Sequence, residues 1–254
     1  MIEFAEFLAQ KKVASTGLSH IHIPKTGGTT VNWLFSDSPL FFNAEHSCFE
    51  QGEKVQGKVS INTPGKGKPG EWPCYNDFLS LNSLIFGVTR NPFSWLVSYY
   101  YHTGVGRFGF NRHAGWQGVK DIYNFQSFDS FVNAYLDMQS WHFPALSKSP
   151  IGQLIDENGC FQGDFLLLSE TLEVSVPAMA AALNFDLAGG LPRLNKSRVE
   201  RDYREFFPDN LAQRVFEKFP EFFNITGYGF EQVFVNMPSP IFIAMERGMK
   251  VRAE

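Results

Sequence analysis

The segment His22-Ile-Pro-Lys-Thr-Gly-Gly-Thr-Thr30 decides how the rest of the chain is interpreted. It follows a short β-prone run at 18–23 and leads into residues 29–35, which have the composition of a helix. This order predicts a strand, a tight glycine turn and a helix that opens at the turn. Glycines let main-chain N–H groups approach an anion, and the amino end of a helix favours negative charge. Lys25 adds a point charge, so the sequence predicts a phosphate-sized binding loop.

This loop differs from the ordinary ATP or GTP loop. The pattern G-x-x-x-x-G-K-[ST] places its lysine after the last glycine, whereas Lys25 precedes both Gly27 and Gly28. Taken alone, the segment is also compatible with a plain strand–turn–helix corner that carries an exposed lysine.

A second candidate anion site begins at Arg90, in Arg90-Asn-Pro-Phe-Ser-Trp-Leu-Val-Ser98. It follows residues 84–89, a continuous apolar run typical of a parallel strand covered on both faces. Pro92 suits the first turn of a helix, and Asn91 is its predicted cap. Arg90 then ends the strand, and Ser98 lies nearly two turns into the helix. A guanidinium and a hydroxyl placed in this way can hold one phosphate, although a solvent-facing serine is the simpler alternative.

The remaining pattern predicts one α/β domain over 1–254. Further helices are predicted over 1–13, 128–136 and 171–183, and a buried strand over 164–169. A late helix is predicted behind Asp209 as its cap, with one apolar face made of Leu211, Val215, Phe216 and Phe219. Residues 36–80 are predicted to be irregular, the core spans about 18–230, and the tail 231–254 has no assignment. Strand-then-helix alternation predicts a three-layer P-loop-type fold with a central, mainly parallel sheet flanked by helices.

Composition narrows the class of protein. Hydrophobic residues make up 44% and charged residues 19%, as in globular domains, and the net charge of −4 gives no reason to expect nucleic acid as a partner. The three cysteines form neither a disulfide framework nor a metal-ligand pattern, so no metal is expected. The acidic amino terminus and the lack of a long apolar run predict a cytoplasmic chain without a membrane span.

The two motifs together resemble the PAPS-dependent sulfotransferases, which use 3′-phosphoadenosine 5′-phosphosulfate (PAPS). Pro-Lys-Thr-Gly-Gly-Thr-Thr is similar to their 5′-phosphosulfate loop, and closest to the branch of heparan 2-O-sulfotransferases and bacterial carbohydrate sulfotransferases. An arginine followed eight residues later by a serine is similar to their 3′-phosphate motif. The resemblance implies PAPS as cofactor, with adenosine 3′,5′-bisphosphate as product. It implies that Arg90 and Ser98 hold the 3′-phosphate, and that the 5′ side is held by Lys25, Thr26, Gly27, Gly28, Thr29 and Thr30.

The resemblance extends more weakly toward the carboxyl terminus. Asp164-Phe-Leu-Leu-Leu-Ser-Glu170 is similar to a family strand that ends in glutamate, and 191–198 followed by 202–206 is similar to a late cofactor-side loop. By this resemblance Lys196, Ser197 and Arg198 close over the nucleotide. Residues 103–125 form an insertion-like stretch that does not align with the family's pattern, which leaves the acceptor open.

The resemblance implies transfer of a sulfuryl group from PAPS to an acceptor hydroxyl by in-line displacement. A carbohydrate is the expected acceptor, from the aromatic content of 16% and by analogy with the family. Lys25 is expected to stabilise developing charge, and His46 to act as general base. His102 or a carboxylate such as Glu45 is the alternative base, while His20 and His22 are expected to be structural.

Two other functions remain open on the sequence. A P-loop kinase acting on a nucleotide or small molecule would need a lysine after the glycines and a metal-binding carboxylate at a later strand end, where Arg90 stands instead. A non-catalytic nucleotide- or glycan-binding protein would keep the fold and lack the base. The oligomeric state is not indicated.

Overall fold

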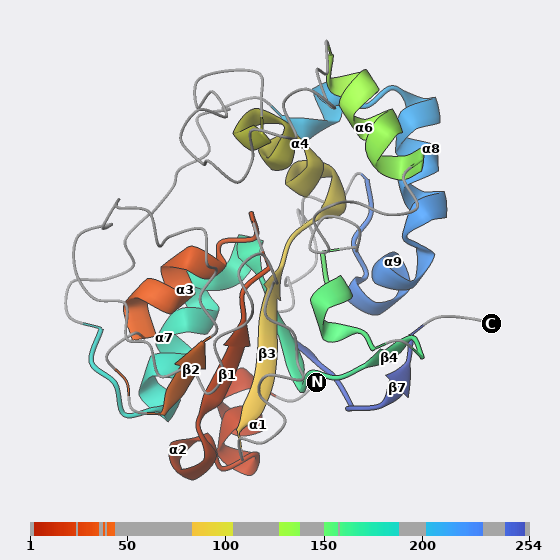
Figure 1. Cartoon of the computed structure of the whole chain (residues 1–254). Coiled ribbons are helices and arrows are strands. Elements are labelled where there is room, and N and C mark those ends of the chain that lie inside the picture. Colours follow the sequence, from red (N-terminus) through yellow and green to blue (C-terminus); the bar gives the residue numbers. More distant parts are fainter. Residues whose placement is uncertain are drawn as a thin grey trace, which may run out of the picture.

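A computed structural model of the chain has a five-stranded sheet at its centre (Figure 1). The structure describes residues 3–23, 25–35, 38, 40–43, 83–103, 127–137, 150–156, 158–187, 202–230 and 242–251. The strands lie in the order β2 (Phe41–Asn43), β1 (Leu18–Ile21), β3 (Leu84–Thr89), β5 (Phe165–Leu168) and β6 (Phe242–Ala244). The α/β class with a mainly parallel sheet is therefore confirmed.

The first four strands of this sheet are parallel, and β6 runs antiparallel to β5. Leu18 of β1 pairs with Phe41 on one side and with Leu84 on the other. Because parallel neighbours start at the same side, the carboxyl ends of β2, β1, β3 and β5 meet at one edge of the sheet. Ligand sites of open α/β sheets form at such an edge.

Both faces of the sheet are covered by helices, as the continuous apolar strands predict. One face, with Phe86 and Phe165, packs against α1 (Phe4–Gln10), α3 (Gly28–Phe35) and α7 (Leu172–Ala182). On the other face, Ile85 and Leu166 belong to one buried cluster with residues of 151–155 and of α4 (Pro92–Thr103), α6 (Phe128–Asp137), α8 (Asp209–Lys218) and α9 (Pro220–Thr226). Figure 1 shows the second helix group beyond the carboxyl end of β3.

Smaller elements complete the described fold. Helix α2 (Val13–Thr16) leads into β1, and the strand β4 (Cys160–Phe161) pairs antiparallel with β7 (Met249–Lys250). Short 3₁₀ helices occupy Gly152–Leu154, Ser169–Thr171 and Tyr203–Phe206. Within the described residues, no helix has both the length and the apolar sequence needed to cross a bilayer.

Three features differ from the sequence-based expectation. Asp209 is the first residue of α8 rather than its cap; Pro208 holds the cap position and makes no side-chain cap bond. The stretch 36–80 was expected to be irregular, yet three of its residues form β2 and extend the sheet. The unassigned tail supplies β6 and β7, so we propose that 242–251 belongs to the same domain as the core.

Candidate active site

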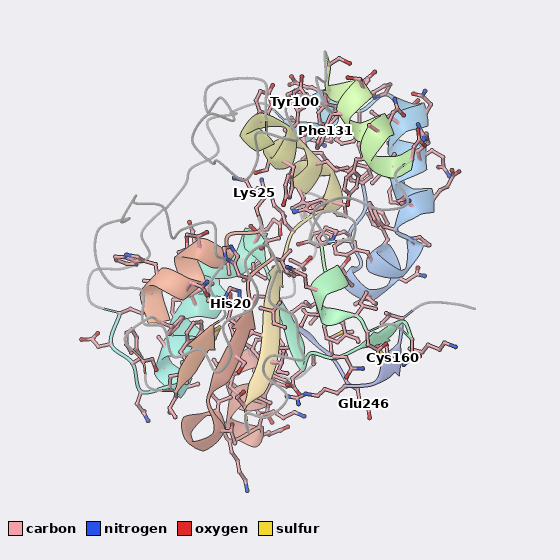
Figure 2. All side chains as sticks on the ribbon, in the orientation of Figure 1. His20, Lys25, Tyr100, Phe131, Cys160 and Glu246 are labelled. Atoms are coloured by element: carbon pink, nitrogen blue, oxygen red, sulfur yellow. The ribbon has the colours of Figure 1, made fainter. Side chains whose placement is uncertain are left out.

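The segments that follow β1, β3 and β5 converge at the carboxyl edge of the sheet. They carry Lys25, Arg90 and Glu170, respectively. Figure 2 shows Lys25 at this edge, between α3 and α4, with His20 further back along β1. The fold therefore brings both predicted anion motifs to one place.

The loop between β1 and α3 is shaped by its own hydrogen bonds. The fully buried hydroxyl of Thr26 donates to the main-chain oxygen of Ile23 at 2.7 Å, and the Thr30 N–H donates to the Gly27 oxygen at 3.0 Å. Gly27 has a φ of +96°, which suits glycine, but Lys25 also has a positive φ, of +67°. A residue with a Cβ pays about 1–2 kcal/mol for that conformation. Strain of this kind concentrates at functional sites, where the surroundings enforce it.

Lys25 and Arg90 lie together in a partly desolvated corner. The Arg90 Nη1 donates to the main-chain oxygen of Lys25 at 3.4 Å, and its Nε donates to the Ser94 hydroxyl at 2.9 Å. Burial, and secondly the nearby Arg90 charge, lower the pKa of Lys25. Burial also lowers the pKa of Arg90, while the charge of Glu170 acts in the opposite sense. Two half-buried cations this close favour an anion between them.

Two histidines, His20 and His22, pack against Gly28 behind the loop. A Cβ added to Gly28 would lie 2.8 Å from the His22 Cδ2 and 2.9 Å from the His20 Cε1, so only glycine fits there without displacement. The His20 Nδ1 lies 2.5 Å from the Asn32 Oδ1, which ties β1 to α3. The His22 Nε2 lies 3.5 Å from the Thr29 hydroxyl. The close packing allows the start of α3 to sit directly against β1.

Helix α4 begins as predicted. The Phe93 N–H donates to the Asn91 side-chain oxygen at 3.0 Å, which makes Asn91 the cap before Pro92. Over residues 92–101, Ser94, Ser98 and Tyr101 are the half-exposed positions and the others are buried. Their spacing places these three on one face of α4. Ser98 thus shares a face with Ser94, although it is Ser94 that contacts Arg90.

Glu170 connects three segments at this edge. Its Oε1 accepts a hydrogen bond from the main-chain N–H of Asn91 at 3.2 Å, and its Oε2 accepts one from the Tyr228 hydroxyl at 2.5 Å. The Asn91 side-chain amide donates to the main-chain oxygen of Gly229 at 3.2 Å. The start of α4 is therefore bound both to the end of β5 and to the turn after α9.

Several predicted site residues lie outside the described part of the chain. These residues are His46, Lys196, Ser197 and Arg198. For His102 the structure describes the main chain, within α4, and not the side chain. Glu45 and nearly all of 103–125 are also outside the described ranges.

Two residues of this site, Ser94 and Tyr228, were not predicted from the sequence. Ser94 lies four residues after Arg90 and one turn before Ser98, so the helical period offered a signal for it. Tyr228 is 58 residues from Glu170, and no local pattern relates the two. Among the described residues, no three histidine, cysteine or carboxylate side chains converge as metal ligands would.

The fold and the site together define an α/β protein that binds a phosphorylated nucleotide. A donor with a 3′-phosphate and a 5′-phosphosulfate carries anionic groups at two points, and the site offers two cations together with the amino end of α3. Glycines at 27 and 28 keep the loop free of Cβ atoms where main-chain amides would meet such a donor. The residues present therefore fit a donor that carries a 3′-phosphate and a 5′-phosphosulfate.

Comparison with known families identifies the class more closely. Residues 14–222 match the Sulfotransferase family, and the chain belongs to it. It is accordingly a PAPS-dependent sulfotransferase, with PAPS as its sulfuryl donor. Comparisons with curated proteins and with solved structures gave no match.

Proposed function

We propose that this sulfotransferase acts on a carbohydrate hydroxyl and belongs to the branch that resembles heparan 2-O-sulfotransferases and bacterial carbohydrate sulfotransferases. The contact between the Arg90 guanidinium and the Lys25 main chain carries the site assignment, because it joins the two predicted phosphate motifs. The acceptor class rests on the sequence resemblance and on the aromatic content of the chain.

Each part of the site has a proposed role toward the donor. Lys25 and the main-chain amides of Gly27 and Gly28 receive the 5′-phosphosulfate, and Thr29 and Thr30 add hydroxyl donors. The Thr26 hydroxyl is used inside the loop, so Thr26 contributes through its main chain. Arg90 and Ser98 receive the 3′-phosphate, with Ser94 holding the guanidinium. Lys196, Ser197 and Arg198 are proposed to close over the nucleotide.

The reaction needs positioning, charge stabilisation and removal of one proton. When bound, PAPS supplies a sulfur centre and a good leaving group. The acceptor oxygen forms a bond to sulfur as the bond from sulfur to the 5′-phosphate oxygen breaks, and the acceptor proton passes to a base. Lys25, at the edge of the loop, offsets the charge that develops on the leaving phosphate.

Binding of adenosine 3′,5′-bisphosphate tests the nucleotide site. Calorimetric titration should show tighter binding of this product than of AMP or ATP·Mg²⁺. Arg90→Ala should remove the preference over AMP, since a charge-assisted contact to phosphate contributes about 1.5–3 kcal/mol. A wild-type protein that prefers ATP·Mg²⁺, or an Arg90→Ala variant that still discriminates, would contradict the assignment.

His46 is the proposed general base, and it follows the last residue of β2 by three positions. The carboxyl end of β2 lies at the same edge of the sheet as Lys25 and Arg90. His46→Gln should lower kcat about 10²–10⁴-fold, with the affinity for adenosine 3′,5′-bisphosphate unchanged. The measurement is single-turnover transfer from labelled PAPS to an acceptor found by screening. A near-wild-type rate would move the role to His102 or to a carboxylate such as Glu45.

A further inference from the structure

Glu170 places a carboxylate near the cations of the nucleotide site, where it would compete with a bound anion if it paired with Arg90. Its charge is close enough to Arg90 to oppose the lowering of the Arg90 pKa by burial. Glu170 is also an exposed residue, so it lies at the surface of the edge and not within the core. Arginine and carboxylate form strong two-point ion pairs, and such a pair would occupy the guanidinium that the 3′-phosphate needs.

The structure holds Glu170 away from that pairing. Its Oε1 accepts the Asn91 N–H and its Oε2 accepts the Tyr228 hydroxyl, so both oxygens already have a partner. Within the described residues, the guanidinium of Arg90 instead donates to Ser94 and to the Lys25 main chain. The carboxylate thus supplies a neighbouring negative charge without taking the donors of Arg90.

The Tyr228 hydroxyl is well suited to holding the Glu170 carboxylate away from Arg90. Its ring is almost fully buried and stacks on Phe222, with ring centroids 5.9 Å apart. Burial, and secondly the charge of Glu170, raise the pKa of Tyr228 well above its usual value. The hydroxyl therefore stays protonated over the whole physiological range and always has a proton to donate.

We propose that Tyr228 and Glu170 are positioning residues that keep Arg90 available for the 3′-phosphate of the nucleotide. Tyr228 acts through Glu170, and Glu170 acts through Asn91 and Arg90. This inference rests on the proposed role of Arg90 and extends it to a pair of residues that no local sequence pattern connects.

The test compares nucleotide preferences of matched variants. Tyr228→Phe removes one hydroxyl and frees the Glu170 Oε2 to pair with Arg90. We expect this change to weaken binding of adenosine 3′,5′-bisphosphate about tenfold, because Arg90 would then give up a charged hydrogen bond to the 3′-phosphate. Binding of AMP, which has no 3′-phosphate, should be unchanged. Tyr135→Phe is the control, because it also removes the hydroxyl of a buried tyrosine, one that lies on α6 and not on a segment assigned to the nucleotide.

A second substitution distinguishes an effect of the Glu170 carboxylate on Arg90 from a general destabilisation of the fold. Adding Glu170→Gln to Tyr228→Phe removes the competing charge and should restore most of the lost affinity. Glu170→Gln alone should bind at least as tightly as wild type, because its amide can keep contact with both Asn91 and Tyr228. Unchanged preference in Tyr228→Phe, or a double variant that is no better than Tyr228→Phe, would overturn the inference. A wild type that does not prefer adenosine 3′,5′-bisphosphate over AMP would instead overturn the proposed function.

Discussion

Lys25 combines an unfavourable main-chain conformation with a partly desolvated charge. Its φ of +67° is one that glycine tolerates better, and its ammonium lies near the guanidinium of Arg90. Both costs fall on a residue at the carboxyl edge of the sheet, in a sulfotransferase that must bind an anionic donor. A bound anion at this position would offset the electrostatic part of this cost. We therefore expect the protein to be more stable with a bound anion than without one.

His20 makes the stability of the protein depend on pH. Burial lowers its pKa from 6.5 to about 4, against the raising effect of its hydrogen bond with Asn32. Above pH 6.5 the imidazole is neutral in both the folded and the unfolded chain. Between pH 6.5 and 4 the unfolded chain binds a proton that the folded chain does not, so stability falls as the pH falls. The full loss is about 3 kcal/mol, reached near pH 4.

Denaturant unfolding of wild type and His20→Phe between pH 7.5 and 4.5 measures this effect. Phenylalanine keeps a ring against Phe86, which stacks on His20 with centroids 4.9 Å apart. The wild type should lose stability more steeply than the variant over this range. A wild type whose midpoint does not change between pH 7 and 5 would show that His20 does not titrate as described, even if the variant fails to fold.

At the scale of elements, the sheet and helix α3 meet through glycine. Gly28 has no room for a Cβ against His20 and His22, so the amino end of α3 lies directly behind the loop. The same end of α3 lies at the edge that carries Lys25, where the amino end of a helix favours negative charge. Strand β1, the loop and α3 are therefore one unit, and the sequence motif describes that unit as a whole.

Helix α4 is fixed from several directions at once. Asn91 caps it, Glu170 and Gly229 bind Asn91, and the buried ring of Phe93 packs against rings of the carboxyl-terminal segments. Phe93 contacts the rings of Tyr203, Phe207, Phe216, Phe223 and Phe230. Much of the phenylalanine content thus serves packing in the part of the chain that the structure describes. These contacts fix the start of α4, and with it the position of Arg90, which directly precedes the cap residue Asn91.

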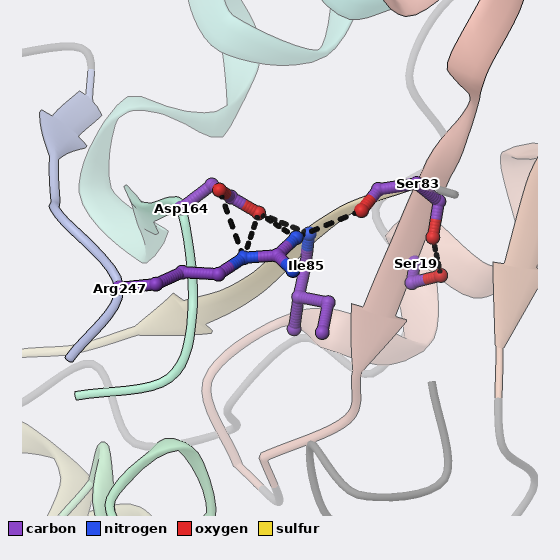
Figure 3. Close-up of polar contacts among 5 residues, drawn as sticks. All are labelled: Ser19, Ser83, Ile85, Asp164 and Arg247. Atoms are coloured by element: carbon purple, nitrogen blue, oxygen red, sulfur yellow. Dashed lines mark hydrogen bonds and ion pairs between the residues drawn. The ribbon is translucent and has the colours of Figure 1, made fainter. Parts of the chain in front are cut away.

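At the scale of the whole molecule, the carboxyl-terminal segment is bound to the side of the sheet away from the site. The Arg247 guanidinium pairs with both oxygens of Asp164 and donates to the Ser83 main-chain oxygen at 2.8 Å (Figure 3). Asp164 also accepts the Ile85 N–H at 2.7 Å. Its side chain is 10% exposed, so the carboxylate depends on these partners.

Arg247→Met should therefore destabilise the fold by about 2–3 kcal/mol, because it leaves a nearly buried carboxylate without its cation and keeps the apolar stem. Arg204→Met is the matched control. The side chains of Arg204 and Asp202 are 39% and 35% exposed, so that ion pair should contribute less than about 1 kcal/mol. Urea unfolding midpoints give both values. Equal losses in the two variants would contradict a special role for Arg247.

The sequence by itself determined the features that are encoded locally. The glycine loop after a strand, the Asn91–Pro92 start of α4 and the continuous apolar runs of β3 and β5 each depend on neighbouring residues. Such patterns specify main-chain conformation and burial within one segment, which is why the α/β class, the strand–turn–helix unit and the sulfotransferase family could be predicted.

The tertiary structure alone decided which distant segments meet. Strand β6 pairs with β5 across 70 or more residues of sequence, and Tyr228 meets Glu170 across 58. The link between Arg90 and the Lys25 main chain spans 65 residues, and no periodicity in the sequence records it. Contacts of this kind arise because packing both faces of the sheet fixes where each strand ends. The chemistry of the site comes from side chains that local sequence patterns place on separate segments, and the folded sheet brings them to one edge.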